Sequence, residues 1–261
     1  MTCAICGKPR TNSESDPHGI FGNHEYQEQK KDQPVGLQIF PHIEQRSEEW
    51  YDQRRGIVTA SVLGKLITPK TVKPASNPDS RALLHLLVAE RVTGWTEPTW
   101  ISSDMQRGID DEPIARAKYA EHYAPVEEAG FMVRDFGNFR IGFSPDGLVG
   151  DEGLIEIKCP RAKGHLTTIV SGHPPIEHMA QLQTGLLVSG RKWIDFVSFC
   201  GGMPMWVHRV KPQQKWFDAI IEAVTTFEEN AKELSRVYTE SVVGLHPTER
   251  TINFADVELK L

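Results

Sequence analysis

The 261-residue chain is 39% hydrophobic and 25% charged, proportions that are ordinary for a globular protein with one full core. No apolar run approaches the roughly 18 residues that a membrane-spanning helix needs, and the polar start of the chain lacks the apolar stretch of a signal peptide, which favours the cytoplasm. The net charge of −6 argues against tight, sequence-blind coating of DNA, but it is compatible with an enzyme that carries local basic patches.

Residues 1–40 are polar and punctuated by Gly and Pro, so they predict an irregular extension ahead of a domain over residues 41–261. Within this extension, Cys3, Cys6, His18 and His24 are spaced nearly as in a two-Cys, two-His zinc site. The segment lacks the hydrophobic positions of a small zinc-finger core. A Zn²⁺ site and a tail with incidental Cys and His residues therefore both remain open.

A probable helix begins near residue 44, and a second short helix toward residue 65 would open near Thr59 or Ser61, with Thr59 as the first choice for its cap. Residues 69–80 predict a loop, although Asn77 followed by Pro78 also suits the start of the next helix, which ends at Gly94. Residues 103–123 have a helical pattern that Pro113 kinks or restarts.

The second half of the chain alternates between the periodicities of strands and helices. Strands are predicted at 131–134, 138–143, 147–149, 153–159, 193–200 and 205–210, and helices at 175–188 and 213–238. This order predicts an α/β fold with a mixed central β-sheet flanked by helices.

The segment from 141 to 160 is the most informative part of the sequence. Asp146 stands in a Ser-Pro-Asp-Gly turn, and the alternation in the strand that follows places Glu156 and Lys158 on one face, with the isoleucines between them in the core. A hairpin would bring Asp146 beside Glu156. Two carboxylates and the backbone carbonyl of Ile157 suit a hard cation such as Mg²⁺, and Lys158 could position or deprotonate an attacking water. On its own, the pattern also fits an edge hairpin with a charged face.

Four motifs together carry a family resemblance. Residues 144–147 with 156–160, and then 49–61, 107–112 and 179–183, resemble in order and spacing the PD-(D/E)xK nuclease superfamily, and more narrowly the lambda exonuclease or YqaJ-type viral recombinase family. The resemblance covers about residues 45–230. It implies a restriction-endonuclease-like core.

The resemblance also implies roles for particular residues. Asp146, Glu156 and Lys158 match the catalytic residues, and Asp146, Glu156 and the Ile157 carbonyl match the ligands of Mg²⁺, for which Mn²⁺ can substitute. Glu112 and Gln181 match residues beside the site, although Glu112 also fits a solvated acidic helix face.

A second set of residues, Arg54, Ser61 and Ser144, matches the family's contacts to a DNA 5′-phosphate, although Arg54 also fits an ordinary surface arginine. The sequence departs from lambda exonuclease at His178, where that enzyme has a tyrosine, so the role of this position stays open.

The resulting prediction is a Mg²⁺-dependent 5′-to-3′ exonuclease that acts on double-stranded DNA and leaves 3′ overhangs for a single-strand annealing protein. By resemblance it would work as a homo-trimeric ring in a bacterial or phage-infected cell. Two alternatives remain open: an endonuclease or nickase with the same catalytic residues, and a DNA-binding module that has lost catalysis.

Overall fold

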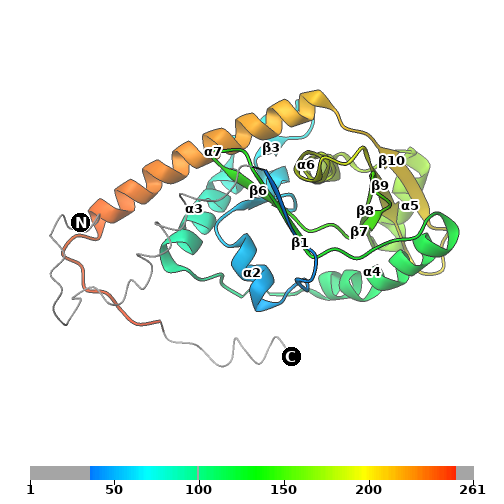
Figure 1. The fold of residues 1–261 in the computed structure, drawn as a ribbon, viewed down its shortest axis with the longest axis horizontal. Coiled ribbons are helices and arrows are strands. Elements are labelled where there is room, and N and C mark those ends of the chain that lie inside the picture. The colour runs from blue at the N-terminus through cyan, green and yellow to red at the C-terminus, as the bar shows by residue number, and fades with distance from the viewer. Residues whose placement is uncertain (1–35, 99, 251–261) are drawn as a thin grey trace. The chain divides into compact units, whose positions relative to one another are not determined.

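The computed structural model describes residues 36–98 and 100–250 (Figure 1). The chain divides into two compact units, and the larger, Val35–Asn230, contains every strand of the described residues. No helix within the described ranges has the length and apolarity needed to cross a bilayer.

The first sheet has the strand order β1-β5-β6-β2. Its members are β1 (Leu37–Phe40), β5 (Phe131–Asp135), β6 (Arg140–Phe143) and β2 (Val58–Thr59). The pairings β1–β5 and β5–β6 are antiparallel, whereas β2 lies parallel to β6. The extension predicted to be irregular through residue 40 therefore ends earlier, because residues 37–40 form an edge strand of this sheet.

The second sheet has the order β10-β9-β8-β7 and carries most of the segment from 141 to 160, whose first three residues belong to β6 of the first sheet. Its members are β7 (Gly147–Val149), β8 (Gly153–Lys158), β9 (Trp193–Ser198) and β10 (Trp206–Val210). The short antiparallel hairpin β7–β8 is followed by a parallel pairing of β8 with β9 and an antiparallel pairing of β9 with β10. The mixed α/β class is confirmed, and the predicted strands are divided between two four-stranded sheets. A further hairpin pairs β3 (Ile67–Thr68) with β4 (Lys73–Pro74).

The remaining elements of the described residues are helices and short 3₁₀ turns. They are α2 (Glu48–Arg54), α3 (Pro78–Thr93), α4 (Ser103–His122), α5 (Ala162–Ser171), α6 (Met179–Ser189) and α7 (Gln214–Ser241), with 3₁₀ turns η2 (Leu63–Lys65) and η3 (Ile176–His178). Helix α4 packs on β8, and α6 packs against β5, β6 and β9, so α6 contacts both sheets (Figure 1).

The starts of the helices follow local capping rules. The Asn77 side chain accepts a hydrogen bond from the Ser80 N–H, and Pro78 occupies the first turn of α3, so the helix-start interpretation of this segment is confirmed. Helix α4 runs through Pro113 as one element. The prediction that Thr59 caps a short helix is wrong, because Thr59 belongs to β2 and pairs with Gly142.

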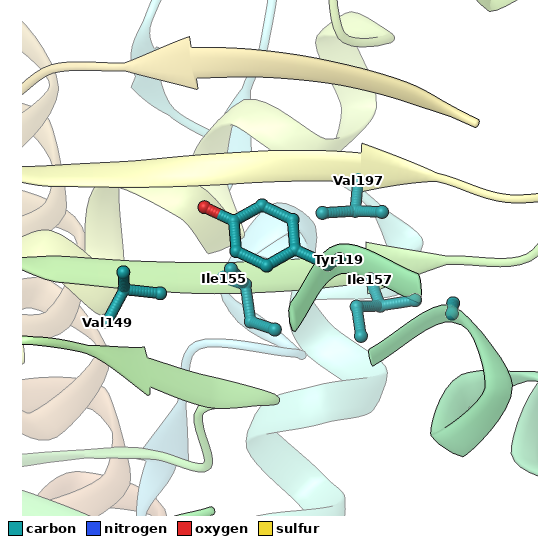
Figure 2. Close-up of a cluster of buried hydrophobic side chains, with 6 residues drawn as sticks. Tyr119, Val149, Ile155, Ile157 and Val197 are labelled. Carbon is teal, nitrogen blue, oxygen red and sulfur yellow. The ribbon is translucent and has the colours of Figure 1, made fainter. Parts of the chain in front are cut away.

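One face of β8 forms part of a hydrophobic core cluster. Figure 2 shows the Tyr119 ring of α4 above Ile155, with Ile157 and Val197 of the second sheet beside it. The Tyr119 hydroxyl donates a 2.6 Å hydrogen bond to the buried Asp195 carboxylate. Because side chains alternate along a strand, this packing directs Glu156 and Lys158 to the opposite face, as the sequence predicts.

Candidate active site

Asp146, Glu156 and Lys158 come together where the turn before β7 meets the end of β8. The Asp146 Oδ2 atom accepts a 2.6 Å hydrogen bond from the Ile157 N–H, and the Lys158 ammonium lies 2.6 Å from Glu156 Oε1. The N–H and C=O of one strand residue point to the same edge. The Ile157 carbonyl therefore points to the edge from which Asp146 approaches.

The two carboxylate oxygens of Glu156 have different surroundings. Oε1 accepts hydrogen bonds from the Lys158 ammonium and from the Gln181 amide of α6, at 2.6 and 2.5 Å. Oε2 is also buried, since Glu156 is only 1% exposed, and it has no hydrogen-bond partner among the residues that the structure describes. An unpartnered buried carboxylate oxygen is costly, and a bound cation would compensate for it. The Glu156 side chain therefore fits a metal ligand.

The donor set is small. Within residues 36–98 and 100–250, no three His, Cys, Asp or Glu side chains gather in the arrangement of a ready-made metal cluster. Two carboxylates and a backbone carbonyl are the kind of incomplete oxygen set that Mg²⁺ accepts, because this ion keeps several of its waters and also binds phosphate oxygens.

The electrostatics of the carboxylates agree with a cation site. Burial raises the pKa of Asp146, and burial followed by the Asp146 charge raises the pKa of Glu156 to about 8. Burial lowers the pKa of Lys158, but the charges of Glu156 and Asp146 raise it more, so its pKa lies above the ordinary value. Without a metal, the Asp146 and Glu156 carboxylates therefore hold protons more tightly than usual, and Lys158 is an ammonium ion.

Glu112 approaches this group from α4. Burial and the charge of Asp146 raise its pKa, which places it within electrostatic reach of the site. Arg116, one turn further along the helix, binds Glu112 at 2.6 Å and donates from Nε to the Asp146 carbonyl at 2.7 Å. Sequence reasoning missed Arg116, although its spacing of four residues from Glu112 was an available signal.

The three residues matched to a 5′-phosphate contact are linked through Trp50. The Arg54 guanidinium lies 3.9 Å from the centre of the Trp50 ring and reaches Ser61 Oγ at 3.5 Å. The Trp50 indole N–H donates to Ser144 Oγ at 2.8 Å. Sequence reasoning read Trp50 only as part of a signature, and the residue joins α2 to the turn that carries Asp146.

The remaining predicted positions differ in their surroundings. Burial, and then the Lys158 charge, lower the pKa of His178 to about 4, so its imidazole is neutral, and it stacks on Phe196. Gln183, which follows Gln181 by two residues, is buried and bonds the Lys211 carbonyl and the Gln213 N–H, so it is a polar packing residue. The proposed zinc ligands Cys3, Cys6, His18 and His24 lie outside the described residues.

The comparisons with known proteins agree with this geometry. The model of the YqaJ-like viral recombinase domain matches residues 49–192, more than half of the chain. The crystal structure of an alkaline exonuclease, LHK-Exo from Laribacter hongkongensis, is 34% identical, with 77% of this chain and 100% of that chain covered and a TM-score of 0.68. The structure of LHK-Exo in complex with dAMP gives 33% identity over the same shares and a TM-score of 0.67.

A phage related exonuclease from Haemophilus somnus 129PT shares the fold. It has 15% identity, coverage of 68% of this chain and 94% of that chain, and a TM-score of 0.50. No curated protein matches the sequence. The family model and the LHK-Exo structures agree, so this chain belongs to the YqaJ-like viral recombinase family, whose members resemble lambda exonuclease, and it is a DNA nuclease.

Proposed function

We propose that the protein is a Mg²⁺-dependent exonuclease that degrades one strand of double-stranded DNA from its 5′ end. The observation that carries the metal-dependent chemistry is the unpartnered, buried Oε2 atom of Glu156, next to Asp146 and Lys158. Mn²⁺ is expected to substitute for Mg²⁺, because both are bound by oxygen ligands.

Metal binding, orientation of the Glu156 carboxylate and orientation of the substrate are assigned to different residues. Asp146, Glu156 and the Ile157 carbonyl would hold the ion, which supplies a polarised water and charge for the phosphate when bound. Gln181 and Lys158 fix the orientation of the Glu156 carboxylate through its other oxygen. The Lys158 ammonium, whose pKa the charges of Glu156 and Asp146 raise in the metal-free protein, would orient water and phosphate oxygens.

The preference for an end is assigned to Arg54, Ser61 and Ser144. Burial lowers the pKa of Arg54, against the charges of Tyr51 and Glu90, so this guanidinium is partly desolvated. A desolvated guanidinium with two hydroxyl groups nearby suits a terminal phosphate dianion. The complex of LHK-Exo with dAMP supports a mononucleotide product.

The biological role follows from this chemistry. Removal of 5′-terminated strands leaves 3′ overhangs, which a single-strand annealing protein would bind during phage-type recombination in the cytoplasm of a bacterial or infected cell. A homo-trimeric ring would keep the enzyme on its DNA. Within residues 1–40, the part that precedes β1 would be an accessory extension, because β1 is an edge strand of the first sheet.

The metal centre is tested by two isosteric variants. Asp146→Asn and Glu156→Gln keep the size of each side chain but remove a charged ligand, so both should abolish cleavage of linear duplex DNA in Mg²⁺ while circular dichroism stays native. Lys158→Ala should lower kcat on the order of 10²-fold, as for a lost positioning group. Robust cleavage by Glu156→Gln would refute the assignment.

A further inference from the structure

Arg46 has an unusual backbone conformation just before α2. Its φ is +72°, and Val72 is the only other non-glycine residue in the described part of the chain with a positive φ. L-residues rarely adopt this left-handed region, because the Cβ atom crowds the following carbonyl. Such conformations persist where the surroundings enforce them, and they gather at functional sites.

The neighbours of Arg46 attach this segment to the turn that carries Asp146. The Gln45 amide donates to the Pro145 carbonyl at 3.5 Å, and the Trp50 indole donates to Ser144 Oγ at 2.8 Å. Ser47 caps α2 by accepting the Trp50 N–H. These contacts on both sides hold Arg46 beside the turn at 144–146.

The Arg46 side chain is exposed and forms no hydrogen bond or ion pair with another described residue. Its charge nevertheless acts to lower the pKa of both Asp146 and Glu112, so the guanidinium lies near these carboxylates without binding either. Within the described ranges, three cations act on Asp146 in this way. Lys158 is bound to Glu156 and Arg116 to Glu112, which leaves Arg46 available for a ligand.

We propose that Arg46 is a substrate-binding residue whose guanidinium contacts a phosphate of the strand being cleaved, next to Asp146. The charges of Asp146, Glu156 and nearby Glu112 repel the DNA backbone, and a guanidinium fork counters this repulsion while it binds phosphate oxygens. The inference rests on the metal centre proposed above. It adds a second phosphate contact at the N-terminal side of α2, whereas Arg54 of the proposed 5′-phosphate set lies at the C-terminal end of this helix.

The backbone conformation provides a discriminating variant. Arg46→Gly removes the guanidinium and at the same time supplies the residue best suited to a φ of +72°. The melting temperature should therefore not fall, whereas kcat/KM on linear duplex DNA should fall about tenfold, as for one lost charge-assisted hydrogen bond. The slope of log(KM) against log[salt] should decrease by about one, as for one lost phosphate contact.

Two further variants serve as controls. Arg46→Lys keeps the positive charge and should recover part of the lost kcat/KM. Lys192→Gln removes an exposed cation that pairs with Glu152, which makes the same change in net charge away from the site, and it should behave like the wild type.

Two results would overturn the proposal: wild-type kcat/KM and salt slope in Arg46→Gly, or a lost activity that accompanies a lowered melting temperature, which would make the role structural. Glu156→Gln reports separately on the metal centre. Cleavage by that variant would refute the centre, whereas a normal Arg46→Gly refutes only the phosphate contact.

Discussion

Glu156 shows how one buried side chain can prepare a site for a ligand. Its Oε1 atom is bound by an ammonium and an amide, and its Oε2 atom is bound by nothing in the described residues. Burial together with the charge of Asp146 raises its pKa to about 8. A proton therefore compensates for this charge in the metal-free protein, and a divalent cation would compete for the same position.

The raised pKa of Glu156 predicts a dependence of stability on pH. The folded pKa of about 8 exceeds the ordinary value of about 4.3, so the folded state retains the proton that the unfolded state loses. The metal-free protein should therefore lose stability as the pH rises from about 4 to 8. The free energy of unfolding of Glu156→Gln should therefore rise relative to that of the wild type, by up to about 1.4 kcal/mol per pH unit in that window.

The measurement is urea unfolding of both proteins with a chelator present, at pH 5, 6, 7 and 8. Addition of Mg²⁺ at pH 8 should stabilise the wild type and leave Glu156→Gln nearly unchanged. A difference between the two proteins that does not vary with pH would contradict the raised pKa.

At the scale of elements, the connection between α2 and β2 positions the proposed 5′-phosphate contacts. Gly56 donates its N–H to the Glu90 carboxylate at 2.7 Å and accepts from Arg91 Nε at 2.6 Å, and Arg91 pairs with Glu228. Its φ is +67°. This turn fixes where the helix bearing Arg54 ends and where the chain toward Ser61 begins.

Gly56→Ala should destabilise the protein. The new Cβ atom would lie 2.6 Å from Arg91 Cγ, in a left-handed conformation that alone costs about 1–2 kcal/mol. Gly172→Ala is a matched control, because Gly172 has a φ of +68° with no atom within 4 Å of the added Cβ. Urea unfolding should show a larger loss for Gly56→Ala. An equal loss in the two variants would mean that the contact with Arg91 adds nothing.

Local elements could be predicted from the sequence, whereas contacts between remote segments could not. The hairpin and the strand that carry Asp146, Glu156 and Lys158 were predictable, because turn residues and alternation are local signals. The contact from Trp50 to Ser144 joins residues 94 positions apart, and no local pattern encodes it. Pairing of β1 with β5 is equally remote, so four residues of strand pattern were read as part of an irregular extension.

Helix α5 was missed because its pattern is inverted. Leu166 and Val170 are exposed, whereas His165 is buried and bonds Ser198 Oγ and the Pro204 carbonyl. The Thr168 hydroxyl bonds the carbonyl four residues earlier, within the helix. The inward-facing partner of this helix is a polar contact to the second sheet, so its buried face carries no apolar helical stripe that would signal it.

For the whole molecule, the boundary of the catalytic unit predicts the effect of truncation. Strand β1 pairs with β5 from Leu37 to Phe40, and the Asp135 N–H binds the Gly36 carbonyl. Deletion of residues 1–34 should therefore retain nuclease activity and melting temperature, whereas deletion of residues 1–40 should lower the melting temperature by several degrees. Equal melting temperatures for the two truncations would show that β1 contributes no stability.

The N-terminal Cys and His residues carry a separate prediction. If Cys3, Cys6, His18 and His24 bind zinc, the purified protein holds about one equivalent, and Cys3→Ser loses it. Elemental analysis of both proteins decides the question. Zinc-free wild-type protein with full nuclease activity would assign these residues to an incidental tail.

The central claim is that the enzyme degrades duplex DNA from a 5′ end. The most direct test is the digestion of linear duplexes in which one strand is labelled near its 5′ end or near its 3′ end. The duplexes carry 5′-phosphate or 5′-hydroxyl termini, and a closed circular duplex serves as the control. With Mg²⁺, the label near the 5′ end should be released first, and phosphorylated ends should be preferred about 10- to 150-fold, a preference that Arg54→Ala should lose. The circle should resist cleavage. Release of the 3′ label first, or rapid cutting of the circle, would contradict the account.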